Sequence, residues 1–280
     1  MQLKLSIFFF LGFIFFIAGC STTKLFYGYG DSIVSWQIDS YFELTNEQED
    51  WVEKQMRQHL EWHRNEELPK YKNFLIDVQN KAKDGLSMSE LDEGFFRFES
   101  KIDRIFERLI PDAALFLTKI SPEQINNLEQ ELAEENDEMK KKLGNRHELL
   151  EERQEDFWEQ MEDWFGDFSI SQRDQITEIQ TKWFTETPDP SAERMERRLK
   201  SQTKFLFLLR SSPEKKQVEK WFRKWTLSWQ GSTDSARKVR ILRNKKRILQ
   251  IDNILTAENR LHAVQELDVW LKNLEQIIGN

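Results

Sequence analysis

The segment that decides the fold runs from Pro122 to Phe168 and reads PEQINNLEQELAEENDEMKKKLGNRHELLEERQEDFWEQMEDWFGDF. Its apolar side chains recur at helical spacing in one thin stripe, and most of the other residues are charged. The stripe consists of Ile125, Leu128, Leu132, Met139, Leu143, Leu150, Phe157, Met161, Trp164 and Phe168. The segment predicts either one helix, roughly 65 Å long, or two helices that meet near Gly144. Because so thin a stripe cannot be deeply buried on several sides, we expect a projecting charged arm or hairpin.

The rest of the chain also predicts helices. It contains only 10 Gly and 6 Pro, 32% of its residues are charged, and no stretch alternates apolar and polar side chains as a strand does. The fold class is therefore all-α, an elongated multi-helix bundle that carries the charged arm 122–168. Pro188 and Pro190 place a boundary between an N-terminal half, 31–187, and a C-terminal half, 188–280. Helices are expected to begin near Ile33, Thr45, Pro69, Ser89, Ala192, Pro213, Thr233 and Ala257.

The first 20 residues, MQLKLSIFFFLGFIFFIAGC, have the composition of a secretory signal. Their apolar run of about 13 residues is shorter than the roughly 20 that a membrane span needs. Its end, Ile17-Ala18-Gly19-Cys20, resembles the lipobox of bacterial lipoproteins, in which the Cys is acylated and becomes the new N-terminus. We therefore expect a lipoprotein signal peptide at 1–19, a lipid on Cys20 and a tether over 20–30. A plain cleaved signal with an incidental Cys is the alternative.

Charge and cysteine usage agree with an envelope location. Cys20 is the single cysteine, and its acylation would leave no odd thiol in an oxidising compartment. The formal net charge is −8, and removal of Lys4 with the signal makes it −9 (−8 − 1), which argues against nucleic acid as a partner. Ser21 stands where lipoproteins retained in the inner membrane have Asp. By this resemblance we expect the outer membrane, facing the periplasm, with the membrane as one partner.

Four expected helix starts share a sequence pattern: an apolar residue, a hydroxyl residue and, three positions after the hydroxyl residue, a polar residue. They are Leu44-Thr45 with Gln48, Ile120-Ser121 with Gln124, Ile170-Ser171 with Asp174, and Leu255-Thr256 with Asn259. These residues fit a capping box, in which the hydroxyl and the later side chain each bond the other's backbone N–H. This pattern also resembles the Leu-Thr-x-x-Gln motifs of small periplasmic chaperones and stress sensors of the Spy and CpxP kind, and Leu44 to Gln48 matches fully. That resemblance implies a thin helical cradle for unfolded clients, whereas ordinary helix capping explains the same residues.

A second resemblance extends over more of the chain. The runs Tyr41-Phe42-Glu43-Leu44-Thr45, Trp62-His63-Arg64 and Glu67-Leu68-Pro69 are similar to those of an uncharacterised family of proteobacterial lipoproteins. This likeness implies a helical fold and an envelope location, and it implies no activity.

Two histidines are the weak candidates for a metal site. His59 and His63 lie four residues apart, a spacing at which two imidazoles on a helix can bind one transition metal. The His-Glu-x-x-His order of zinc peptidases is absent, and both residues fall on an apolar stripe, which favours buried histidines without metal. We therefore expect no cofactor.

The run from Arg237 to Arg247 is the one basic block in this acidic chain. If Ile241 faces inward, Arg240, Arg243 and Arg247 share an outer face that could contact anionic lipid headgroups, an anionic envelope polymer or the acidic arm. A solvated surface is the simpler explanation.

The sequence carries no recognisable catalytic grouping among its four His and one Cys, so it predicts no enzyme. The first hypothesis is a lipid-anchored, periplasm-facing binding protein that holds unfolded clients, with Leu132, Met139 and Leu143 as contact residues. The second hypothesis is a structural or assembly factor that binds one defined envelope partner.

Cys20→Ala tests the predicted anchor. Because the thiol is the acyl acceptor, we expect the variant to keep its signal peptide and to take up no acyl label. Metabolic labelling with a fatty acid and the mass of the purified chain measure both effects. Normal trimming and sorting of the variant would contradict the lipoprotein prediction.

Overall fold

The computed structural model describes residues 20–186, 191–230 and 235–279, and every regular element in these ranges is a helix. The predicted all-α fold is therefore confirmed. The expected signal peptide, 1–19, and the expected boundary at Pro188 and Pro190 lie outside the described residues. No helix within those ranges combines the length and apolar character needed to cross a membrane. The elements are α2 (Cys20–Phe42), α3 (Asn46–Trp62), the π-helix η1 (His63–Glu67), α4 (Leu68–Lys81), α5 (Met88–Leu117), α6 (Pro122–Gly144), α7 (Arg146–Phe165), α8 (Ile170–Glu186), α9 (Ser191–Arg210), α10 (Lys215–Gln230), α11 (Ser235–Asp252) and α12 (Ala257–Ile278).

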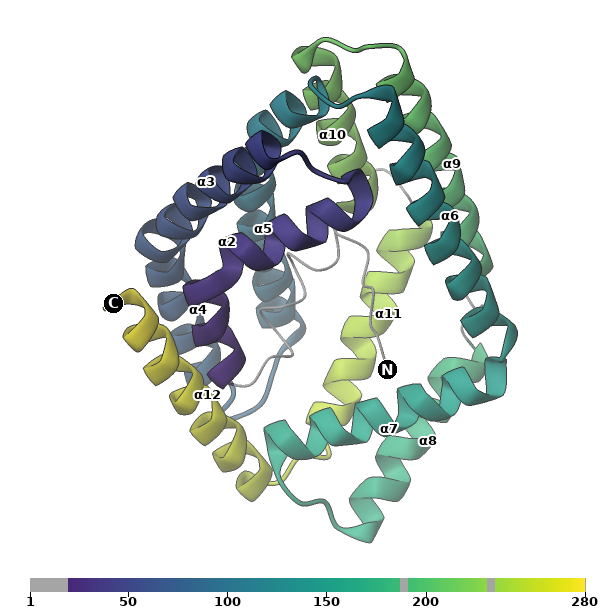
Figure 1. Ribbon diagram of the computed structural model, residues 1–280. Helices are drawn as coiled ribbons and strands as arrows, with labels where there is room; N and C mark the ends of the chain where they lie inside the picture. The colour runs from purple at the N-terminus through teal and green to yellow at the C-terminus, as the bar shows by residue number, and fades with distance from the viewer. Residues whose placement is uncertain (1–19, 187–190, 231–234, 280) are drawn as a thin grey trace.

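Four helices form a closed circuit, which we call the frame. α2 packs on α6, α6 leads into α7, α7 packs on α12, and α12 packs back on α2. Figure 1 shows these four helices as the sides of a quadrilateral. The remaining helices pack on the frame or on one another: α3 packs on α2, α4 on α12, α9 on α6, α10 on α5, and α11 on both α8 and α5.

The walls of the molecule are thin. Among the described residues, most buried apolar side chains belong to three separate clusters. The largest, which we call the main core, joins α2, α3, α5, α6, α9 and α10, the second joins α2, α4 and α12, and the third joins α7, α8 and α11.

The charged segment does not form the expected projecting arm or hairpin. It breaks at Asn145 into α6 and α7, which diverge as two sides of the frame. Ile125 and Leu128 are buried in the main core, because α2 and α9 cover α6. Asn136, which interrupts the apolar stripe, is buried too and bonds Gln202 on α9. α6 is therefore covered from two directions by helices distant in sequence, and polar side chains such as Asn136 take part in these contacts.

The N-terminal helix begins earlier than expected. Residues 20–30, expected as a tether, belong to α2, which begins at Cys20. Phe26 packs in the main core, and Tyr27 packs against α4 and α12. The described chain therefore enters the frame without an intervening linker.

Two of the four predicted caps meet in what we call the first cap joint. Thr45 and Ser121 form capping boxes with Gln48 and Gln124, as the sequence predicts. The two Gln amides also bond each other, with N···O distances of 3.1 and 2.7 Å. Gln124 donates a further bond to the carbonyl of Glu43. The joint therefore ties the α2–α3 turn to the start of α6.

The other two caps form the second cap joint, and one of them shifts in register. The expected cap Ser171 is wrong, because α8 begins at Ile170 and Ser169 exchanges capping bonds with Gln172. Gln172 donates to Asn259, the capping amide of α12, at 2.9 Å. Asn259 in turn donates to the carbonyls of Phe165 and Asp167, so this joint ties the α7–α8 turn to α12.

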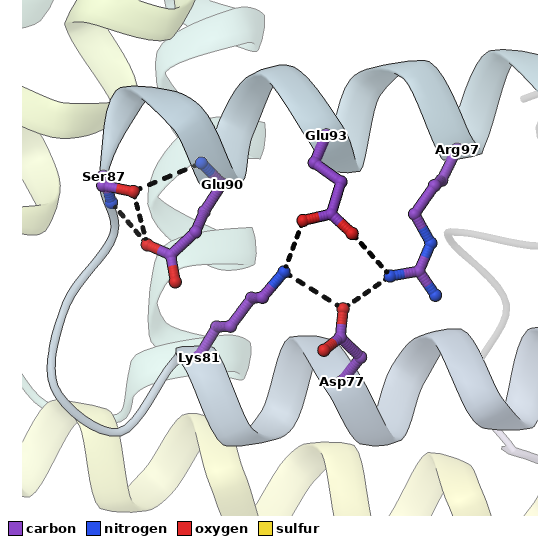
Figure 2. A network of polar contacts seen from close by, with 6 residues as sticks. All are labelled: Asp77, Lys81, Ser87, Glu90, Glu93 and Arg97. Carbon is purple, nitrogen blue, oxygen red and sulfur yellow. Dashed lines mark hydrogen bonds and ion pairs between the residues drawn. The ribbon is translucent and has the colours of Figure 1, made fainter.

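The turn between α4 and α5 corrects a second expected cap. Ser87 forms the capping box with Glu90, so Ser89, where the helix was expected to begin, lies inside α5. Figure 2 shows this box beside an ion network in which Lys81 and Arg97 each contact both Asp77 and Glu93. The network joins α4 to α5 at the surface, where such pairs contribute little individually.

A π-helix links α3 to α4 and builds a buried polar cluster. Pro69, which follows it, lacks the N–H of a regular helix, and a π turn accommodates such a break. His63 lies between two hydroxyls, 2.5 Å from that of Tyr27 and 3.2 Å from that of Tyr71. Glu67 is fully buried: burial favours a higher pKa, but bonds from Arg104 and Lys70 outweigh it and lower the pKa.

A double-mutant cycle tests the first cap joint. Gln48→Ala and Gln124→Ala each remove a capping bond and half of the amide pair, so each should lower the free energy of unfolding by about 1 kcal/mol. Since the two amides contact each other, the double variant should deviate from additivity by about 1 kcal/mol in urea melts. Gln124→Ala combined with Gln172→Ala, in the other joint, is the additive control. If the effects of the first pair are additive, the two amides do not interact and the joint does not contribute to stability.

The pH dependence of stability tests the buried imidazole. Burial lowers the pKa of His63 to about 4 from 6.5, an effect that Glu67 partly offsets. Between these values the unfolded chain binds the proton more readily, so stability should fall as pH decreases from about 6.5 to about 4. His63→Gln keeps hydrogen-bonding capacity without titrating, and it should flatten the profile by about 2 kcal/mol between roughly pH 7.5 and 5 in urea melts. An unchanged profile in this variant would refute burial of a neutral His63.

Candidate binding pocket

Two of the three predicted arginines line a pocket between α8 and α11. Its volume is about 510 Å³. Arg243 and Arg247 contribute from the basic block, together with Lys246, whereas Arg240 lies outside the lining. The lining consists of Gln175, Glu178, Ile179, Lys182, Trp183, Arg243, Lys246, Arg247, Gln250 and Ile254.

Arg247 is the most constrained cation of the pocket. Its guanidinium carbon lies 4.4 Å from the ring centroid of Trp183. One terminal nitrogen donates to Gln180 at 3.0 Å, and the other donates to Asn244 at 2.8 Å. Burial lowers the pKa of Arg247. Both acceptors are neutral amides, so these bonds fix the guanidinium in place without neutralising its charge.

Two further cations face the same space. Lys182 on α8 and Lys246 on α11 are exposed, and neither forms an ion pair with a carboxylate of the described residues. Glu178 is the one carboxylate among the lining residues. The pocket is thus a positively charged recess on an acidic protein, flanked by an indole and two isoleucines. Such a recess can bind an anion.

The opposite face of α11 behaves differently. Lys245 is buried, pairs with Asp92 on α5 at 2.8 Å and lies 4.8 Å from the ring centroid of Phe95. The basic block therefore divides into a neutralised face toward α5 and the face that lines the pocket. The sequence does not identify Lys182 and Trp183 as pocket residues, because no local pattern indicates that α8 packs on α11.

The predicted client-contact residues differ in how accessible they are to solvent. Leu132 packs against the main core, Leu143 is half-buried, and Met139 is 38% exposed. The accessible part of the stripe is therefore the corner at which α6 meets α7, which we call the α6–α7 corner. Asp137, Glu138, Glu148 and Glu152 surround it as exposed carboxylates.

The two candidate metal ligands bond different groups. His59 contacts Asp112 at 3.0 Å, and both ring nitrogens of His63 contact tyrosine hydroxyls. Burial lowers the pKa of His59, with opposing effects from Asp112. Within the described ranges, no group of three or more His, Cys, Asp or Glu has a metal-binding arrangement. Cys20, the expected lipidation site, is the first residue of α2.

Comparison with known proteins places the chain in a family. No curated protein and no solved structure matches it. One family model, described as a family of unknown function (DUF6279), matches residues 40–218. The matched region contains the first cap joint and the α8 side of the pocket, whereas α11 and α12 follow it. Since the match covers 179 of the 280 residues (218 − 40 + 1), the chain belongs to the DUF6279 family of unknown function.

Proposed function

We propose that this protein is a lipid-anchored helical binding protein on the periplasmic face of the outer membrane, where it holds unfolded or partly folded protein clients without catalysing a reaction. The signal-like N-terminus and Cys20 support the anchor and the location. Because α2 begins at Cys20, the acyl chains would join the frame directly and keep it close to the membrane surface.

The observation that carries the holding function is the apolar surface at the α6–α7 corner. Met139 and Leu143 remain accessible there, among exposed carboxylates and the exposed Lys140, Lys141 and Lys142. Holding a client requires apolar surface for contact together with charge that keeps the complex soluble.

An aggregation assay tests client holding. A form that starts at Ser21 should slow the aggregation of unrelated unfolded proteins at a near-equal molar ratio and without ATP. Met139→Ser with Leu143→Ser should weaken this effect several-fold while shifting the melting temperature by only a few degrees, since partly exposed side chains contribute less to stability than core residues. Light scattering and thermal melts measure the two quantities.

Two further variants serve as controls. Leu132→Ser should lower the melting temperature clearly, because Leu132 packs against the core. Phe207→Ser, at a side chain 77% exposed on α9, should leave holding unchanged. If wild-type protein does not slow aggregation at all, the holding function is wrong.

A second function, assembly of one defined envelope partner, is favoured by the α8–α11 pocket. Its central guanidinium is held by an indole and two amides, and fixed groups of this kind suit one specific ligand. Crosslinking in intact cells separates the two functions: many unrelated clients support holding, whereas one dominant partner supports assembly.

A further inference from the structure

We propose that the α8–α11 pocket binds an organic phosphate, in which a phosphate group is carried by a molecule with an apolar portion. This site is separate from the α6–α7 corner, so it does not depend on the client-holding function. The proposal stands on the charge, the shape and the composition of the pocket.

The charge of the pocket calls for an anion. Lys182, Lys246 and Arg247 have no carboxylate partner in the described part of the chain, although the protein has 49 Asp and Glu residues. A guanidinium removed from water is destabilised unless an opposite charge compensates it. The amides of Gln180 and Asn244 satisfy hydrogen bonds of Arg247 and leave its charge in place. An anion that enters the pocket would supply the missing compensation.

The cations are arranged for an oxyanion with a tetrahedral centre. A planar carboxylate is usually satisfied by one arginine, whereas a phosphate monoester has three acceptor oxygens and up to two negative charges, and the phosphodiester of a lipid headgroup has two such oxygens and one charge. Here Lys182 approaches from α8, and Lys246 and Arg247 approach from α11. Two helices thus present cations to the same space, an arrangement that suits a tetrahedral anion.

The size and the apolar wall indicate a larger molecule than inorganic phosphate. The volume of about 510 Å³ lies within the range of about 300–1,000 Å³ that is typical of small-molecule sites. Trp183, Ile179 and Ile254 line the same pocket and offer contact area for a carbon skeleton. Both the headgroup region of an anionic phospholipid and a soluble phosphate ester have this chemistry.

Calorimetric titration of the full chain in a neutral detergent tests the site. The probes are phenyl phosphate, a soluble ester with an apolar ring; dihexanoyl phosphatidylglycerol, an anionic lipid; and dihexanoyl phosphatidylcholine, a zwitterionic lipid with the same tails. We expect saturable binding of at least one anionic probe and much weaker binding of phosphatidylcholine. Binding of phenyl phosphate assigns the site to soluble esters, and binding of phosphatidylglycerol alone assigns it to lipid headgroups.

A pair of matched variants locates the binding. Lys182→Gln with Lys246→Gln changes two exposed pocket residues, so the fold should persist and affinity should fall about tenfold or more. Lys238→Gln with Arg240→Gln removes the same charge from α11 outside the pocket lining, and affinity should change less than about twofold. Circular dichroism confirms that both variants remain helical.

Three results would overturn the proposal. Neither anionic probe might bind, phosphatidylcholine might bind as well as phosphatidylglycerol, or both variants might lose affinity equally. The second result would show capture of apolar tails, and the third would show attraction to the general charge of α11.

Discussion

The arrangement of this fold depends on helix caps that bond each other. The first N–H groups of a helix have no partner within the helix, and capping boxes satisfy some of them locally. In this protein the capping amide of one helix also bonds the capping amide of another, at Gln48 with Gln124 and at Gln172 with Asn259. Gln124 and Asn259 are buried, so loss of their partners would leave amides unsatisfied, at about 1–3 kcal/mol each. The joints lie at two corners of the frame and fix which helix starts face each other.

Such polar joints matter because the walls are thin. Three separate apolar clusters restrict helix angles less than one continuous core would, since apolar contacts are non-directional. Directional bonds set the register instead. Between α6 and α9, Arg198 bonds Glu135 at 2.5 Å and Asn136 at 2.7 Å, and Tyr41 on α2 also bonds Glu135. The buried polar residues that interrupt the apolar stripe of α6 thereby specify its neighbours.

Local features of this fold were predictable from the sequence, and contacts distant in sequence were not. The caps at Thr45, Ser121 and Thr256 follow from neighbouring residues and are confirmed. The predictions at Ser89 and Ser171 are wrong. In each case a Ser two positions earlier fits the same pattern and forms the cap, and the local sequence does not distinguish between the two. The burial of α6 and the meeting of α8 with α11 bring together segments more than 60 residues apart, and an amphipathic stripe does not identify the helix that covers it.

The two faces of α11 likewise differ because of contacts that are distant in sequence. Sequence identifies the basic block but not its neighbours, which are Asp92 for Lys245 and Lys182 with Trp183 for Arg247. The fold therefore pairs Lys245 with a carboxylate and places other cations around a recess whose lining contains a single carboxylate, Glu178. Grouped like charges repel each other and reduce stability, and a carboxylate in place of Gln175 or Gln250 would relieve this strain. An arrangement that lowers stability in the unbound state is consistent with the proposed phosphate ligand, whose negative charge would restore the balance.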